Sequence, residues 1–368
     1  MSQAEAPGAE IVSQRVKRRG PAPASRTNLR AVAQHAGVSA ATVSRVLADS
    51  ESVRPETRDK VLRSVAELGY VVNGLARAMT GRGKQIVAFL VSEMVGPSFA
   101  ALANGVEQVA SENDAMFVLC TTHGDAEREL EWVTLMAQQR AAAVLLVGAS
   151  PMGEQHTSRL KRYLQELDPV GTRLILCGHP PSPDLPRIAS ISYDNHGGAY
   201  ELTRHLTDLG HRKILFVGAE PNQSTVSDRL AGYQKALADA GIAADDELII
   251  GGPFTIDGGY DGITLAMNRN LDFTAVLGAS DAVSIGALRA LKQAGKAVPG
   301  DVSLVGIDDV PLTADLTPAL TTVHVPFEEL GRMTAAVALG LTGEQAEHIE
   351  LKTELVIRES TGHPPVTE

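Results

Sequence analysis

Two kinds of hydrophobic pattern divide the chain. Near its start, apolar residues recur every three or four positions, whereas from residue 85 onward continuous apolar runs alternate with helical patterns. The first pattern is typical of amphipathic helices. The second is typical of parallel strands that are buried on both faces and separated by helices. The sequence therefore predicts a small helical region followed by a larger α/β body.

The region 27–72 is predicted to form three short helices. Gly37 permits a left-handed turn after the first helix, and Ser39 suits the N-cap of the second. Pro55 suits the first turn of the third helix, which is expected to end at Gly69. The side chains expected to face inward are Leu29, Val32, Ala33 and Ala36, then Val43, Val46 and Leu47, then Val61, Leu62, Val65 and Leu68.

Two short helices joined by a glycine turn, with a third helix in support, are typical of a helix-turn-helix. The outer face of the second helix would carry Ala40, Ala41, Ser44 and Arg45. Small residues let a helix approach a major groove closely, and an Arg can bond both acceptors of guanine. Hydroxyls of Ser39, Thr42 and Ser44 would hold phosphates. The alternative is a three-helix bundle that binds no DNA.

Charge is distributed unevenly along the chain. Residues 1–84 carry a net charge of +7, while the remainder carries −18, which together give −11. A basic head on an acidic body indicates that the head meets a polyanion. A solvated basic tail is the alternative, and residues 1–26, rich in Pro and Ala, have the composition of a disordered segment.

The stretch NLRAVAQHAGVSAATVSRVLADSESVRPETRDKVLRSVAELGYVVNGLARAM resembles the DNA-binding head of the lactose-repressor (LacI) family of bacterial transcription regulators. The resemblance implies that Ala40, Ala41 and Arg45 read bases. It also implies a hinge helix within residues 73–84 that folds on DNA and inserts an apolar wedge, Met79, into the minor groove. The remaining residues it assigns to DNA contact are Asn28, Ser39, Thr42, Ser44, Thr57, Asn73, Ala76 and Arg77.

The body, residues 85–362, is predicted to contain two doubly wound lobes. The strands expected from its apolar runs lie within 85–92, 115–122, 142–149, 173–179, 213–219, 247–252, 274–280 and 302–308. The family resemblance implies a periplasmic-binding-protein-like body whose chain crosses between lobes near Ser192, near Val323 and again near its end. The first lobe would span about 85–191 and 324–352, and the second about 192–323 and 353–362, with a tail at 363–368.

Ligands of doubly wound sheets bind beyond the carboxyl ends of the strands. By resemblance, the effector-binding residues are Phe99, Arg229, Phe254, Ser280, Asp281 and Asp308. A guanidinium and a carboxylate can each hold two hydroxyls while aromatic rings cover a sugar face. The alternatives are that Asp281 caps a helix, that the two Phe residues are core, and that Arg229 and Asp308 form an ion pair between the lobes.

The nature of the effector stays open at two positions. Ser280 replaces the family's usual Asn, and Gly178 stands where sugar-binding members often carry Asp. Both changes remove hydroxyl-binding capacity. A sugar or sugar derivative is expected, and a smaller or less polar molecule is the alternative.

Other classes of protein receive little support from the sequence. It contains no GxSxG, Walker or HExxH motif, so we expect no enzymatic activity, cofactor or metal. Cys120 and Cys177 are expected to be buried free thiols. Without an apolar run of membrane-spanning length or a secretory signal, a cytoplasmic protein is expected, associated with the nucleoid when bound to DNA, and a solute-binding protein of a transport system is disfavoured.

The sequence therefore predicts a sequence-specific DNA-binding transcriptional regulator under small-molecule allosteric control. It is expected to act as a repressor, with activation as the alternative. A homodimer would read a pseudo-palindromic operator in double-stranded DNA, because two-fold symmetry of the protein imposes two-fold symmetry on its site.

Overall fold

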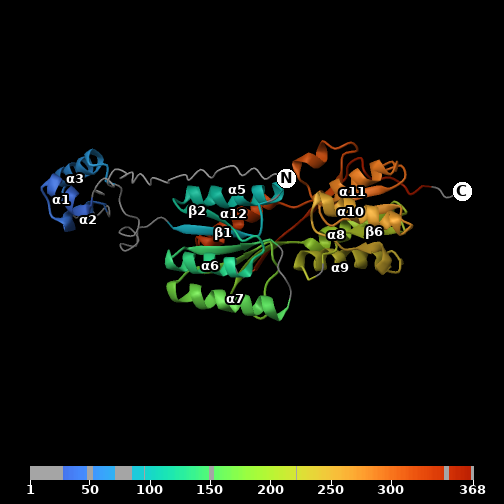
Figure 1. Cartoon of the computed structure of the whole chain (residues 1–368), viewed down its shortest axis with the longest axis horizontal. Coiled ribbons are helices and arrows are strands. Elements are labelled where there is room, and N and C mark those ends of the chain that lie inside the picture. The colour runs from blue at the N-terminus through green and yellow to red at the C-terminus, as the bar shows by residue number, and fades with distance from the viewer. Residues whose placement is uncertain are drawn as a thin grey trace, which may run out of the picture. The chain divides into compact units, whose positions relative to one another are not determined.

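The computed structural model describes residues 28–47, 53–70, 85–94, 96–148, 153–220, 222–343 and 348–365. The chain divides into two compact units, residues 1–83 and 84–368 (Figure 1). The first unit contains the helical head and the second contains the α/β body. The predicted hinge contacts Asn73, Ala76, Arg77 and Met79 lie outside the described residues.

The head contains helices α1 (Leu29–Ala36), α2 (Ala40–Leu47) and α3 (Pro55–Glu67). Gly37 adopts the left-handed conformation, with φ of 68°, and turns the chain between α1 and α2. The Ser39 hydroxyl accepts a hydrogen bond from the Thr42 amide at 3.1 Å. The predicted turn, the N-cap of α2 and the start of α3 at Pro55 are thereby confirmed.

The core of the head is small, and one predicted core residue is wrong. Val32, Val43 and Val61 are completely buried. Leu62, in contrast, is 47% exposed, because it follows Val61 by 100° around α3 and so leaves the inward face. Ser64 lies on that face instead, where its hydroxyl donates to the Lys60 carbonyl and pairs with the His35 ring.

The first lobe of the body is a fully parallel six-stranded sheet. In order across the sheet, its strands are β11 (His348–Leu351), β5 (Ala189–Tyr193), β4 (Arg173–Cys177), β3 (Ala143–Val147), β1 (Ile86–Val91) and β2 (Met116–Thr121). Its helices are α5 (Pro97–Glu112), α6 (Ala126–Gln138), α7 (Glu154–Leu167) and α12 (Phe327–Ala338).

The second lobe repeats this architecture with one antiparallel edge strand. Its strands, in order across the sheet, are β12 (Glu354–Val356), β10 (Thr321–His324), β9 (Ser303–Asp308), β8 (Ala275–Gly278), β6 (Ile214–Val217) and β7 (Ile249–Ile250), and β12 runs antiparallel to β10. Its helices are α8 (Asn195–Asp208), α9 (Ser224–Asp239), α10 (Ile256–Asn268) and α11 (Asp281–Gln293).

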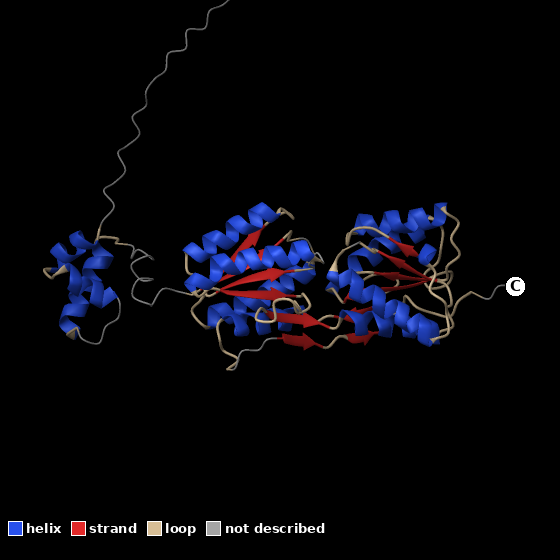
Figure 2. Cartoon of the chain, turned by 90° about the horizontal axis from the view of Figure 1, so that it is seen from below, coloured by secondary structure: helices blue, strands red, loops and turns tan. Residues whose placement is uncertain are grey.

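Both sheets are covered by helices on their two faces (Figure 2). Side chains of β1 alternate between the two faces of its sheet. Val87 and Phe89 face the layer of α5 and α12, while Ala88 and Leu90 face α6 and α7. In β6, Phe216 likewise packs toward α8 and α9, and Leu215 toward α10 and α11. Burial on both faces explains why these strands read as continuous apolar runs.

The eight strands predicted from apolar runs are all present. Strands β5, β10, β11 and β12 were missed, since they are short and rich in Ser, Thr and charged residues: ASISY, TTVH, HIEL and ELV. The missed strands lie at the three crossings between the lobes, 193–195, 324–327 and 351–354. The Thr353 hydroxyl donates to the Asp194 carbonyl at 3.3 Å and so ties the last crossing to the first.

Cys120 and Cys177 are both buried free thiols, as predicted. Within the described ranges, no helix is long and apolar enough to cross a membrane.

Glycines allow the paired helices to approach closely. A Cβ built on Gly105 of α5 would lie 2.1 Å from the Glu328 carbonyl oxygen of α12, and one on Gly331 would lie 2.1 Å from the Leu102 carbonyl oxygen. In the second lobe, a Cβ built on Gly232 of α9 would likewise lie 2.1 Å from the His196 carbonyl oxygen of α8. These backbone contacts leave no room for a methyl group.

We expect Gly105→Ala to lower the free energy of unfolding by about 1–3 kcal/mol, because α5 and α12 must move apart. Intrinsic helix propensity acts in the opposite direction, by up to about 1 kcal/mol. Denaturant unfolding measures the difference. The control is Asn104→Ala, on the exposed side of the same helix, and an equal effect of both variants would rule out the close approach as the cause.

Candidate functional site

One face of α2 is exposed and carries small and hydroxyl-bearing residues with a single cation. Val43 and Val46 point into the head core, and the opposite side exposes Ala41, Ser44 and Arg45. Ala40 and Thr42 are half-buried. Of the three predicted base-reading residues, Ala41 and Arg45 are thus exposed at the helix surface, whereas Ala40 packs partly against the head core.

Several predicted phosphate contacts also have structural roles. The Asn28 side chain caps α1 by accepting from the Ala31 amide at 3.0 Å. The hydroxyls of Ser39 and Thr42 lie 2.8 Å apart at the start of α2. Thr57 is half-buried in the first turn of α3. Helix N-termini present free amides that favour phosphate oxygens, so the start of α2 is chemically suited to a DNA backbone.

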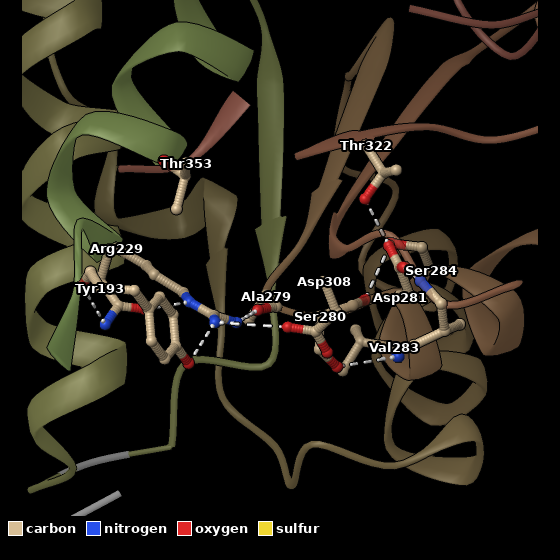
Figure 3. Close-up of polar contacts among 12 residues, drawn as sticks. Tyr193, Arg229, Ala279, Ser280, Asp281, Val283, Ser284, Asp308, Thr322 and Thr353 are labelled. Carbon is tan, nitrogen blue, oxygen red and sulfur yellow. Dashed lines mark hydrogen bonds and ion pairs between the residues drawn. The ribbon is translucent and has the colours of Figure 1, made fainter. Parts of the chain in front are cut away.

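In the body, Arg229 on α9 occupies the centre of the region between the strand ends (Figure 3). Its side chain is 1% exposed. Its Nε donates to Asn195 Oδ1 at 2.8 Å, and its Nη1 donates to the Ala279 carbonyl. Its Nη2 donates to the Tyr193 hydroxyl at 3.2 Å and reaches Asp308 Oδ1 at 3.5 Å. The guanidinium is thus held by four acceptors.

Asp308 ends β9 and pairs with Arg229 within the second lobe. The alternative of an ion pair between the lobes is therefore wrong for these two residues. Asp308 has a φ of 132°, a conformation that is costly for a residue with a side chain. Such strain is characteristic of functional sites and persists only where surrounding contacts enforce it.

The charge of the Asp308 carboxyl is disfavoured by its surroundings. Burial, and to a smaller degree the carboxylate of Asp281, raise its pKa to about 7, although Arg229 and hydrogen bonds from Arg229 and Ser98 act in the opposite direction. Ser98 belongs to α5 of the first lobe and lines the same cavity as Asp308.

Asp281 and Ser280 are engaged in holding the second lobe together. Asp281 is fully buried; its Oδ1 accepts from the Thr322 hydroxyl at 2.6 Å and its Oδ2 from the Val310 amide at 2.9 Å (Figure 3). Burial raises the pKa of Asp281 to about 6. Ser280 caps α11 by accepting from the Val283 amide at 3.3 Å.

Phe99 and Phe254 are half-buried, at the rim of the core. Phe254 lies with its ring centroid 5.6 Å from the Arg229 guanidinium carbon, and Phe99 lies close to Gly148 at the end of β3. A cavity of about 450 Å³ opens beside Ser98 and Asp308, and its remaining lining comes from α5, the turn after β9, the crossing at 324–327 and the start of α12.

Sequence reasoning missed three residues of this constellation: Tyr193, Asn195 and Ser98. Tyr193 ends the polar strand β5, and Asn195 begins α8 directly after the first crossing. The sequence could have indicated Asn195 as a site residue, since it follows the crossing between the lobes that was predicted near Ser192. Ser98 precedes the predicted Phe99 in the first turn of α5.

The architecture defines a class of protein: a helix-turn-helix head joined to a two-lobed body of the periplasmic-binding-protein type. Residues 28–73 match the model of the bacterial regulatory proteins of the lacI family, and residues 203–361 match the periplasmic binding protein-like domain.

Relatives align over nearly their whole length. The transcriptional regulator CelR of Thermobifida fusca is 35% identical over 343 residues, which cover 91% of this chain and 98% of CelR. A solved CelR–cellobiose complex superposes with a TM-score of 0.67 at 33% identity, over 91% of this chain and all of that chain. The lac repressor dimer bound to operator and an anti-inducer gives a TM-score of 0.80 at 26% identity, over 92% of this chain and all of that chain.

The chain belongs to the LacI family of bacterial transcriptional regulators. The family expectation from the sequence is confirmed, and so are the α/β fold with its helical head and the function in transcription regulation.

We expect Asp308→Asn to alter the pH dependence of stability. The unfolded chain releases this proton near pH 3.9 and the folded protein near pH 7, so the folded state binds the proton more tightly. The stability of the natural protein relative to the variant should therefore fall as pH rises from about 4 to about 7, by on the order of 2–4 kcal/mol. Denaturant unfolding across this range measures it.

The control for this experiment is Asp272→Asn, which removes an exposed carboxylate from the same lobe. A constant difference between Asp308→Asn and the natural protein at every pH would mean that folding leaves the pKa of Asp308 unchanged.

Proposed function

We propose that this chain is an operator-binding repressor whose affinity for DNA is set by a polyhydroxylated small molecule bound between the lobes of its body. The exposed face of α2, with Arg45 as its one projecting cation, carries the DNA-binding part of this proposal. Arg45 would bond guanine, Ala40 and Ala41 would contact thymine methyl groups, and Ser39, Thr42, Ser44, Thr57 and Asn28 would contact phosphates. The hinge contacts would be Asn73, Ala76, Arg77 and Met79.

The effector would bind where Arg229, Asp308 and the ring of Phe254 meet, with Phe99 on the side of the first lobe. Arg229 and Asp308 supply donors and acceptors for adjacent hydroxyls, and the rings cover an apolar sugar face. We assign Ser280 and Asp281 a positioning role, because their polar atoms already hold α11 and the turn after β9. The cellobiose complex of CelR makes a disaccharide the first molecule to test.

A homodimer would form along the free edges of the two sheets. Strand β2 is an edge strand and exposes Met116 and Leu119, and α10, which follows the edge strand β7, exposes Ile256 and Leu265. Equivalent edges of both lobes thus present apolar side chains, which is characteristic of an isologous interface. The lac repressor binds its operator as a dimer, which supports a dimer of this chain.

Regulation rather than catalysis is supported by the relatives, which are transcriptional regulators. We infer that the chain has no enzymatic activity and works in the cytoplasm, where its DNA lies. The division into a head at 27–72, a hinge at 73–84 and a body at 85–362 is part of the proposal.

The experiment that tests this function is selection of bound duplexes from a random DNA pool by the full-length protein at near-physiological salt. Enrichment of a pseudo-palindrome with a fixed centre would support a dimer that uses both heads. That site then becomes the probe for release by cellobiose and other sugars. Binding that is sensitive to salt and indifferent to sequence would contradict the proposal.

Arg45→Ala should weaken binding to the selected site by about 1–3 kcal/mol, because one bidentate base contact is lost. The position read by Arg45 should also become less specific. Arg63→Ala is the control, since it removes an equal charge from an exposed position of α3. Equal losses in the two variants would show that Arg45 contributes only general electrostatic attraction.

Phe254→Ala should leave operator affinity unchanged and abolish release by effector, because the ring beside Arg229 is removed. Fluorescence anisotropy of the selected operator, titrated with cellobiose, measures both quantities. Ile357→Ala is the control, since it removes an exposed apolar side chain of the same lobe beside the opposite edge strand, β12. If cellobiose released operator DNA from Phe254→Ala as readily as from the natural protein, the Phe254 ring would not be part of the effector site.

A further inference from the structure

Arg229 cannot be reached by a ligand in the arrangement that the structure shows. Its side chain is 1% exposed, and its donors are directed at Asn195, Ala279, Tyr193 and Asp308. A molecule that bonds this guanidinium must therefore replace one of these four partners.

Tyr193 differs from the other three partners in its origin. Asn195 begins α8, Ala279 follows β8 and Asp308 ends β9, so all three belong to the second lobe together with Arg229. Tyr193 ends β5 of the first lobe (Figure 3). Its 3.2 Å contact with Nη2 is the one that separation of the lobes would break, while the three contacts within the second lobe would remain.

A second contact joins the lobes at the same place. The N-cap of α5 is Gly96, which has a φ of 96° and offers no side chain to cap the helix. Asp308 of the second lobe lines the same cavity as Pro97 and Ser98 in the first turn of α5, and the Ser98 side chain lowers the pKa of the Asp308 carboxyl. The Ser98 hydroxyl and the Asp308 carboxyl therefore face one cavity from the two lobes.

The ring of Tyr193 is held in position by its own lobe. It packs edge to face against Phe327 with ring centroids 5.7 Å apart, and Gly178 lies beside it, since a Cβ there would lie in van der Waals contact, 4.0 Å from Tyr193 Cε1. The hydroxyl is therefore presented to Arg229 by a fixed ring. The cavity beside Ser98 and Asp308 gives an incoming molecule room to reach the Asp308 carboxyl before it reaches Arg229.

We propose that Tyr193 is an internal competitor of the effector: its hydroxyl occupies the Arg229 donor that an effector hydroxyl would take. Together with the contact between Ser98 and Asp308, it holds the lobes against each other when no effector is bound. We call these four residues, Ser98, Tyr193, Arg229 and Asp308, the interlobe latch. The competitor role rests on the proposed function, in which the effector binds at Arg229, whereas the latch itself does not.

Hydrogen–deuterium exchange of the full-length protein without ligand tests the latch. Tyr193→Phe keeps the ring and removes the hydroxyl, and Ser98→Ala removes the second contact. In each variant, amides in the first turn of α5 and in the turn after β9 should exchange about three to ten times faster, while those of α7 should not change. Unchanged exchange at the cleft in both variants would overturn the latch.

Tyr163→Phe is the matched control. It also removes a buried tyrosine hydroxyl, which donates to Glu129 Oε1 at 2.7 Å within the first lobe. Faster exchange at the cleft in this control would show that the effect of Tyr193→Phe reflects general loss of stability and would likewise overturn the latch.

Calorimetry with cellobiose as the probe tests the competition. Tyr193→Phe should bind cellobiose about three to ten times more tightly than the natural protein, because a donor of Arg229 is released. Weaker binding would make Tyr193 a direct ligand contact and would overturn the competitor role. If neither protein binds cellobiose, the proposed disaccharide effector fails, and the exchange experiment still decides whether the latch exists.

Discussion

The burial of one guanidinium organises the body of this protein. A charged group removed from water is costly unless acceptors surround it. The acceptors of Arg229 come from the first crossing (Asn195), the end of β8 (Ala279), the end of β9 (Asp308) and the other lobe (Tyr193). Their positions are therefore mutually constrained, and the site is a consequence of how the two sheets are joined.

The two lobes repeat one architecture but contribute different chemistry. The second lobe supplies the ion pair and the network around Asp281, which fixes the turn after β9 to β10. The first lobe supplies Phe99, Tyr193 and Ser98 near the same strand ends. A ligand at the proposed site would contact both lobes, so its binding would depend on their relative position, which is the physical requirement for allosteric control.

Much of the fold was predictable from the sequence because it depends on local pattern. Periodic apolar positions and the Gly37 turn identify the helices of the head, and long apolar runs identify strands buried on both faces. Leu62 was misplaced since apolar character alone does not assign a residue to one side of a helix, whereas the nearby Ser64 is buried with partners. The polar strands at the crossings carry no such pattern, and Tyr193 was missed with them.

The sequence by itself determined the class of protein, the order of its elements and the candidate residues of the head and cleft. Only the tertiary structure decided which of those side chains are available to a ligand. Asp281 proved to be a fully buried support, and Arg229 to be enclosed by partners from both lobes. The reason is physical: residues 193, 229 and 308 are far apart along the chain, and their meeting depends on the crossings between two sheets.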